Sequence, residues 1–263
     1  MRIHFYKYEG TGNDFIVLDF TQKTFTLDKN HIIKLCDRHL GIGSDGLIVL
    51  KKTSMADFEM SFFNPDGSCG MMCGNGGRVA ALAANDFGII SNEVMSFKAP
   101  DGIHFAKIQD NYNISLKMNI VSGYKVFKDG IWLDTGTSHF VVKVNDLKNM
   151  DVLSVGKKLR DSKRFSKYGG ANINFYKAKK KNELNIRTFE KGVENETLAC
   201  GTGITATALA YCIIEKMKDG KHTIKVNALG GILKVDFVKQ KDEFSNIILT
   251  GNANKVFEGN IDI

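Results

Sequence analysis

The sequence predicts an α+β protein of two pseudo-symmetric domains, each a curled, mostly antiparallel sheet around a central helix. Two observations lead to this prediction. The segments "CGNGGRVAALA" from Cys73 and "CGTGITATALA" from Cys200 repeat one pattern of cysteine, glycines and an alanine-rich run. Strand-like segments with tight turns also recur in the same order around both motifs. A length of 263 residues is enough for two domains of ordinary size.

The first half alternates strand and helix signals. Residues 27–41 have apolar side chains at helical spacing, with Asp28 as a candidate N-cap and Gly41 as a stop signal. A second helix follows Cys73, and the turn Pro100-Asp101-Gly102 predicts a hairpin. Alternating or β-branched runs predict strands at 2–8, 14–20, 46–50, 58–64, 93–99, 102–108 and 113–120.

The second half repeats this order. A helix is expected at about 151–164, another after Cys200, and hairpins at Asp129-Gly130 and Gly230-Gly231. Strands are predicted at 124–127, 131–136, 139–144, 171–178, 183–190, 222–228, 231–238 and 246–257. The boundary is placed near 119–122. The expected domains are therefore residues 1–120, completed by the last C-terminal residues, and residues 121–263.

Composition excludes several classes of protein. The 43% hydrophobic and 25% charged content is typical of a soluble globular chain. No apolar run is long enough for a membrane span, and the first residues lack a secretion signal, so we expect a cytoplasmic protein. The five cysteines form no disulfide framework or zinc motif. Part of the net charge of +7 lies in two basic runs at 157–168 and 177–184. These runs lack interleaved aromatic residues, so we expect them to be solvated surfaces. A basic nucleic-acid-binding protein is the remote alternative.

A cysteine that begins a helix has unusual chemistry. The first turn exposes backbone N–H groups and partial positive charge, which stabilise a thiolate or bind an anion. Glycines after the cysteine let a ligand approach the backbone closely. Cys36 and Cys212 lie among apolar neighbours in helices and are expected to be packed thiols, whereas Cys69 has no assigned role.

The pairing of Cys73 and Cys200 indicates an acid–base couple. Equivalent helices of a duplicated chain are expected to direct their N-termini into one interdomain cleft, a common place for a small-molecule site. One thiolate could then remove a Cα proton from one face of an amino acid, while the other thiol delivers a proton to the opposite face. A single nucleophilic cysteine, as in a cysteine hydrolase, would need a histidine partner and would not explain the duplication.

The segments "NPDGSCGMMCGNGGR" and "FEKGVENETLACGTG", together with "GTGNDF", resemble the diaminopimelate epimerase family along the whole chain. The resemblance implies a two-domain fold and the interconversion of LL- and meso-diaminopimelate, a step of lysine and peptidoglycan-precursor synthesis. It implies a homodimer with no cofactor and no metal, whose partner is its small-molecule substrate and not a nucleic acid or a membrane.

The resemblance also assigns roles to residues, position by position. Cys73 and Cys200 match the catalytic pair. The residues that would bind the α-carboxylate and amino group are Gly74, Asn75, Gly201 and Thr202. The residues that resemble substrate-contacting asparagines are Asn13, Asn64 and Asn172, whose amides also suit turns. Glu190 matches an acidic residue near the substrate's amino groups, and His139 matches a histidine close to the active site.

Two positions depart from the family pattern. Ser138 replaces the usual proline before His139, with Thr137 in the place of a substrate-contacting polar residue. Lys191 follows Glu190 where the family has an arginine that would clamp the distal carboxylate.

Related enzymes remain as alternatives. Two-thiol racemases of proline or hydroxyproline generally carry histidine where this chain has Asn75, and they need no distal-carboxylate site. The phenazine-type isomerases share the fold but lack the cysteine pair.

Overall fold

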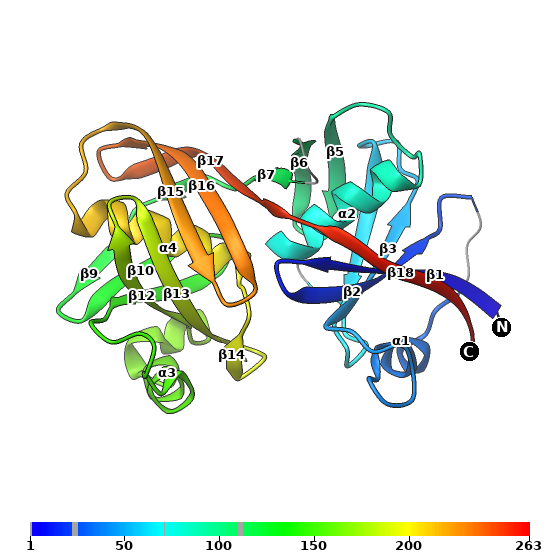
Figure 1. Ribbon diagram of the computed structural model, residues 1–263, viewed down its shortest axis with the longest axis horizontal. Coiled ribbons are helices and arrows are strands. Elements are labelled where there is room, and N and C mark those ends of the chain that lie inside the picture. Colours follow the sequence, from blue (N-terminus) through cyan, green and yellow to red (C-terminus); the bar gives the residue numbers. More distant parts are fainter. Residues whose placement is uncertain (1, 23–25, 71, 110–112) are drawn as a thin grey trace. The chain divides into compact units, whose positions relative to one another are not determined.

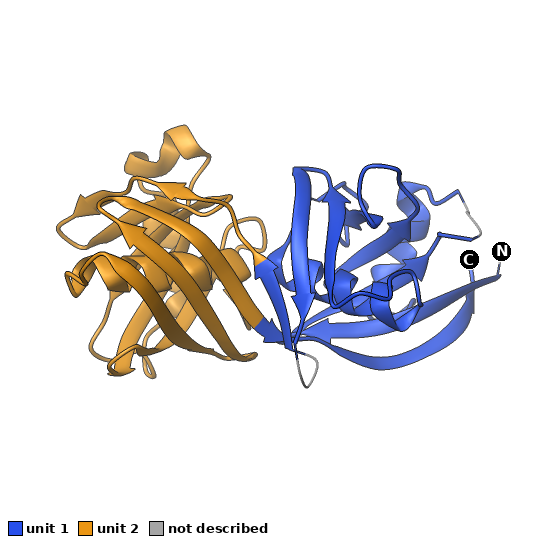
Figure 2. Cartoon of the chain, turned by 90° about the horizontal axis from the view of Figure 1, so that it is seen from above, with its two compact units in different colours: residues 1–116, 251–263 blue, residues 117–250 orange. Residues whose placement is uncertain are grey.

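The chain divides into two compact units. The computed structural model describes residues 2–22, 26–70, 72–109 and 113–263. Unit 1 contains residues 1–116 and 251–263, and unit 2 contains residues 117–250 (Figure 2). The last residues of the chain therefore belong to the same unit as the first ones.

Unit 1 is built on a mixed sheet. Its strand order is β18-β1-β2-β3-β4-β5-β6-β7, in which β2/β3 and β4/β5 are parallel and the other pairs antiparallel. The strands are β1 (Arg2–Gly10), β2 (Asn13–Asp19), β3 (Gly46–Lys51), β4 (Phe58–Phe63), β5 (Val94–Ala99), β6 (Gly102–Ile108), β7 (Asn113–Lys117) and β18 (Asn254–Asp262).

Unit 2 has a sheet of the same kind. Its order is β9-β10-β11-β12-β13-β15-β16-β17, with β11/β12 and β13/β15 parallel; β14 pairs with β13 and β8 with β17. The strands are β8 (Val121–Ser122), β9 (Lys125–Phe127), β10 (Gly130–Asp134), β11 (Ser138–Lys143), β12 (Asn172–Lys180), β13 (Glu183–Glu190), β14 (Asn195–Thr197), β15 (Gly220–Ala228), β16 (Gly231–Gln240) and β17 (Glu243–Asn252).

The two units share one topology. From β1 to β7 and from β10 to β17, leaving out the short β14, the pairings run antiparallel, parallel, antiparallel, parallel, antiparallel and antiparallel. Helices α1 (Lys29–Cys36) and α3 (Val152–Arg160) occupy the same place within the two series, before β3 and β12. The predicted α+β class with two pseudo-symmetric halves is confirmed.

The repeated cysteine motifs form the central helix of each unit. These are α2 (Gly74–Asp86) and α4 (Gly201–Ile214), which Figure 1 shows inside their sheets. Alanine favours both helices, and most of each helix is buried on all sides. Helix α2 contacts β1, β2, β3, β4, β6 and β18, and α4 contacts β10, β11, β12, β13, β15 and β16. A helix buried on every side is a core element, around which the sheet curls.

Several predicted elements differ in extent, three of them in a way that matters for the topology. Helix α1 is shorter than the predicted 27–41, although Asp28 does cap it by accepting a hydrogen bond from the His31 backbone N–H at 2.9 Å. Helix α3 ends at Arg160 and is followed by the 3-10 helix η2 (Lys163–Tyr168), where one helix at 151–164 was expected. The single strand predicted at 246–257 is two strands, β17 and β18, separated by the buried Ala253.

Candidate active site

Cys73 is the N-cap of α2 in unit 1. Its backbone is extended, with φ −100° and ψ 132°, and the first helical bond runs from the Gly77 N–H to the Cys73 carbonyl at 2.7 Å. The thiol-bearing residue is half-buried, whereas Gly74 and Asn75 behind it are buried. A first helical turn has N–H groups without intrahelical partners, and this one begins at the cysteine.

Cys200 holds the same position on α4 in unit 2. Its backbone is again extended, with φ −117° and ψ 111°, and Ile204 N–H donates to the Cys200 carbonyl at 2.8 Å. The residue is 7% exposed, and its sulfur lies 3.4 Å from the Thr202 hydroxyl. The hydroxyl of the buried Thr135 donates to the Thr202 carbonyl at 2.9 Å and so holds this turn in place. The predicted position of both cysteines at helix N-termini is confirmed.

The other three cysteines have different surroundings. Cys36 and Cys212 are buried, and burial raises the pKa of the Cys36 thiol and raises that of Cys212 to about 11. The thiolate is the form of cysteine that acts as a base or a nucleophile, and a high thiol pKa leaves little of it at neutral pH. These two are packed thiols, as their sequence context indicated. Cys69 is exposed in the loop before α2.

The first turns of α2 and α4, with their N-cap cysteines, are called the first and second helix mouths. Asn13 and Asn75 lie together at the first helix mouth. Asn75 Nδ2 donates to Asn13 Oδ1, although 62 positions separate the two residues in sequence. Arg78, which is fully buried one turn into α2, donates to Asn75 Oδ1 at 2.9 Å and to the Gly74 carbonyl at 3.1 Å. Arg78 lies within the first cysteine motif but is not among the predicted site residues.

Asn64 lies in the turn after β4. Its amide Nδ2 donates to the Ser68 hydroxyl at 2.9 Å, its backbone N–H donates to the Ser68 carbonyl at 2.9 Å, and its carbonyl accepts from Gly67 N–H at 2.9 Å. Gly67 has φ +78°, a conformation that glycine adopts without strain. The amide of Asn64 therefore takes part in the turn itself.

His139 on β11 is the centre of a buried polar cluster in unit 2. Its Nδ1 lies 3.0 Å from Asn174 Nδ2, and Asn174 Oδ1 accepts from the Thr188 hydroxyl at 3.1 Å. Burial, and then the charge of Lys191, lower the pKa of His139 to about 3. The imidazole is therefore neutral at physiological pH. Since Nδ1 accepts from the amide, the ring proton lies on Nε2, which is buried and has no protein partner among the described residues.

The remaining predicted residues of unit 2 have hydrogen-bond partners of their own. Asn172, directly opposite His139 on the parallel strand β12, accepts from the Lys191 backbone N–H at 2.8 Å and donates to the Ser138 carbonyl at 3.4 Å. Glu190 at the end of β13 accepts from the Thr197 hydroxyl at 2.8 Å. The Thr137 carbonyl accepts from Thr135 N–H at 3.2 Å in the turn between β10 and β11.

Sequence reasoning missed Arg78, Thr135 and Asn174. Asn174 could have been found, because it lies two residues after Asn172 on one strand and so shares its face. No group of three or more His, Cys, Asp or Glu side chains in the described ranges could hold a metal ion. No helix in the same ranges is long and apolar enough to cross a membrane.

Known proteins resemble the chain over its whole length. A diaminopimelate epimerase from Flavobacterium psychrophilum is 43% identical over 257 residues, covering 97% of this chain and 99% of the relative. Another from a Nitratiruptor species is 41% identical over 258 residues, covering 96% of each.

Solved structures show the same fold at low sequence identity. A PhzF-family phenazine biosynthesis protein from Bacillus anthracis has a TM-score of 0.78 at 17% identity and covers 100% of both chains. A hydroxyproline epimerase from Agrobacterium vitis, with bound trans-4-hydroxy-L-proline, has a TM-score of 0.72 at 13% identity and covers 99% of this chain and 92% of that one. The diaminopimelate epimerase family model matches residues 5–122 and 131–256. The chain belongs to the diaminopimelate epimerase family.

Proposed function

We propose that the protein interconverts LL- and meso-diaminopimelate by moving a proton at Cα between the thiols of Cys73 and Cys200. The observation that carries the proposal is the identical place of the two cysteines, each the N-cap of the central helix of one repeat. Membership of the epimerase family supports the choice of substrate. Cys36 and Cys212 do not begin a helix: they are buried near the C-terminal ends of α1 and α4, where burial raises the pKa of both thiols.

The proposed reaction has two proton transfers. One thiolate takes the Cα proton, and the electron pair of the broken C–H bond passes into the adjacent carboxylate, which gains enolate character. The other thiol then protonates the carbon from the opposite face. In the reverse direction the two groups exchange roles, so the reaction needs no net oxidant, reductant or cofactor.

The two helix mouths supply the electrostatics of this scheme. N–H groups of a first helical turn are fixed donors, and they stabilise negative charge as it develops on a carboxylate. We assign this task to the backbone at Gly74, Asn75, Gly201 and Thr202. The glycines among them leave the backbone accessible to the ligand.

The rest of the substrate would be held by polar side chains of both units. We propose Asn13, Asn64 and Asn172 as contacts to its polar groups, Glu190 as the partner of an amino group, and Lys191 as the partner of the distal carboxylate. His139 and Thr137 support the second helix mouth. Lys191 offers a point charge to a carboxylate, whereas an arginine would offer a fork.

We also propose that the protein works in the cytoplasm as a homodimer, without a nucleic-acid or membrane partner. The family resemblance supports this arrangement. Light scattering on the purified protein tests the dimer, and a monomer at working concentrations would contradict it.

The function is tested by incubation with LL-diaminopimelate in deuterium oxide. The meso product should carry deuterium at the inverted carbon, while the starting isomer retains protium at early times, because the acid thiol exchanges with solvent before it protonates the carbon. L-Proline and trans-4-hydroxy-L-proline are incubated in parallel. Inversion of either in preference to diaminopimelate would transfer the two-thiol chemistry to another substrate, and no exchange in any of them would contradict the proposal.

A further inference from the structure

The two asparagines of the first helix mouth lie within a longer chain of hydrogen bonds in unit 1. Arg78 Nη2 donates to Asn75 Oδ1 at 2.9 Å, and Asn75 Nδ2 donates to Asn13 Oδ1. Asn13 Nδ2 then donates to Asp45 Oδ2 at 3.0 Å. The chain thus runs from a guanidinium to a carboxylate through two amides.

The two ends of this chain determine the orientation of both amides. A guanidinium has only donors and an ionised carboxylate has only acceptors, whereas an amide has one end of each kind. Asn75 must therefore present its oxygen to Arg78, and Asn13 must present its nitrogen to Asp45. A flip of either amide would break both of its hydrogen bonds in this chain. At one contact two donors would face each other, and at the other contact two acceptors would. The usual ambiguity between the O and N atoms of asparagine is absent here.

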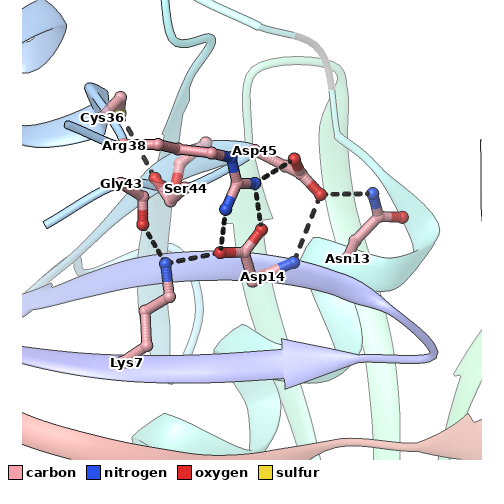
Figure 3. Close-up of polar contacts among 9 residues, drawn as sticks. Lys7, Asn13, Asp14, Cys36, Arg38, Gly43, Ser44 and Asp45 are labelled. Carbon is pink, nitrogen blue, oxygen red and sulfur yellow. Dashed lines mark hydrogen bonds and ion pairs between the residues drawn. The ribbon is translucent and has the colours of Figure 1, made fainter.

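The Asp45 end is held by a cluster of charges, drawn in Figure 3. Arg38 Nη2 donates to Asp45 Oδ1 at 2.7 Å, and the same guanidinium binds both oxygens of Asp14 at 2.7 and 3.1 Å. The Lys7 ammonium lies 2.6 Å from Asp14 and donates to the Gly43 carbonyl. Burial alone would raise the pKa of Asp14, but the hydrogen bonds of Arg38 and Lys7 outweigh it and lower the pKa to about 2.

The Arg78 end is fixed by burial. The side chain is 0% exposed, and although burial lowers its pKa to about 10, the guanidinium stays charged at neutral pH. It donates to the buried Thr11 hydroxyl at 2.8 Å and to the Gly74 carbonyl at 3.1 Å, as well as to Asn75. A buried cation needs such partners, so its geometry has little freedom. Arg78 therefore fixes the backbone next to Cys73 together with the Asn75 amide.

We propose that Asp45 and Arg78 are positioning residues that fix the side-chain amides of Asn13 and Asn75 in one orientation for the substrate. The inference rests on the proposed function, in which both asparagines serve the substrate. Asn13 keeps one N–H beyond the one that it gives to Asp45, and this donor is oriented before a substrate oxygen arrives. Preorganised donors of this kind contribute most when the site excludes water.

The substitution Asp45→Asn tests one end of the chain. The new amide has the shape of the carboxylate but can also donate, so Asn13 would no longer be held in one orientation. The Asp45 side chain is 40% exposed, so its ion pair with Arg38 contributes little to stability. We expect kcat/KM for diaminopimelate to fall about tenfold, mainly through KM, with an unchanged urea midpoint.

Asp14→Asn is the matched control. It disturbs the same charge cluster and deprives the buried Lys7 of its carboxylate, but it leaves the bond between Asp45 and Asn13 intact. We expect the opposite pattern, a lower urea midpoint with kcat/KM within about threefold of the parent. Equal effects of the two variants on kcat/KM would show that the cluster is only structural and would overturn the proposal.

Arg78→Lys tests the other end. Lysine keeps the charge but donates from a single nitrogen, so it cannot reach the Gly74 carbonyl, Thr11 and Asn75 together. We expect kcat/KM to fall at least about tenfold while the circular dichroism spectrum is retained. Parental kinetics in this variant would contradict the proposed role of Arg78. If the variant fails to fold, the comparison of Asp45→Asn with Asp14→Asn decides the proposal.

Nuclear magnetic resonance gives a test that does not depend on turnover. The side-chain amide signals of Asn13 are identified by their loss in Asn13→Asp, and their hydrogen exchange is compared in the parent, Asp45→Asn and Asp14→Asn proteins. Exchange should accelerate roughly tenfold or more in Asp45→Asn alone. Unchanged exchange in that variant would overturn the inference. If the three proteins show this exchange pattern but the parent does not epimerise diaminopimelate, the proposed function is refuted. The positioning of Asn13 by Asp45 is then still supported.

Discussion

Gly203→Ala is expected to destabilise unit 2, although alanine normally favours a helix. Gly203 lies in the first turn of α4, three residues after Cys200. A Cβ atom at this position would lie 2.3 Å from Asn174 Oδ1 and 3.4 Å from the Cys200 Cβ. The first distance is far below van der Waals contact. Asn174 is fully buried and cannot move toward solvent, so the clash must be relieved inside the core.

The magnitude follows from two opposing effects. Replacing glycine in a helix by alanine gains up to about 1 kcal/mol. Against this, a shift of Asn174 weakens its hydrogen bonds to His139 and Thr188, and each buried group left without a partner costs about 1–3 kcal/mol. The net loss should therefore be about 2 kcal/mol in the free energy of unfolding of unit 2.

Gly76→Ala is the matched control, because Gly76 has the equivalent position three residues after Cys73. Its added Cβ would lie 3.4 Å from the methyl end of Met60 and 3.5 Å from Ile48 Cδ1, which are ordinary contacts. We expect stability within about 0.5 kcal/mol of the parent. Urea unfolding is followed by circular dichroism for both units and by fluorescence of the single tryptophan, Trp132, for unit 2. A Gly203→Ala protein as stable as the parent, or equal losses in both variants, would refute the reasoning.

Further predictions concern chemistry and pH. Cys73→Ala and Cys200→Ala should each abolish epimerisation with the fold retained, and the double variant should be little worse; near-normal turnover by either would end the two-base scheme. The pKa of His139 is about 3 in the folded protein and about 6.5 in the unfolded chain, so lowering the pH from 6.5 toward 3 protonates the unfolded chain first. The free energy of unfolding should therefore fall by on the order of 4 kcal/mol over this range. His139→Gln should make the unfolding curves less dependent on pH in the same window. Lys191→Ala should raise KM for diaminopimelate and lower kcat/KM roughly ten- to a hundredfold, whereas Lys191→Arg should have parental or better kinetics. Parental kinetics in the alanine variant would show that Lys191 is solvated and does not bind the substrate.

The order of elements was predictable because the two repeats confirm each other. Each half has the same series of strand patterns around a cysteine-headed helix, so a weak signal in one half is supported by its counterpart in the other. The exchange of partners after β17 was not predictable. Residues 246–257 look like one continuous strand in the sequence, but β17 pairs with β16 and β18 with β1, a change that depends on distant parts of the chain.

The cysteines could be placed from local sequence, but the groups that hold their helix mouths could not. Glycine, cysteine and alanine in one short motif indicate a helix N-terminus directly. Arg78 and Asp45 are charged residues, and a charged residue is usually solvated. Their roles depend on partners far away in sequence, such as Thr11 for Arg78 and Asn13 for Asp45. Only the folded sheet of unit 1 brings these groups together.

The two repeats hold the same backbone group by different chemistry. Five residues after the cysteine, Arg78 donates to the Gly74 carbonyl at 3.1 Å in unit 1, and the Thr205 hydroxyl donates to the Gly201 carbonyl at 3.0 Å in unit 2. One helix mouth therefore has a buried cation behind it, while at the equivalent position the other has a neutral hydroxyl. In the proposed mechanism this difference is permitted, because LL- and meso-diaminopimelate are diastereomers and present different surroundings to the two thiols. The equilibrium constant between the two isomers is set by their free energies in solution, not by the enzyme. Unequal thiols can therefore speed or slow both directions together, but they cannot change the ratio of the isomers at equilibrium.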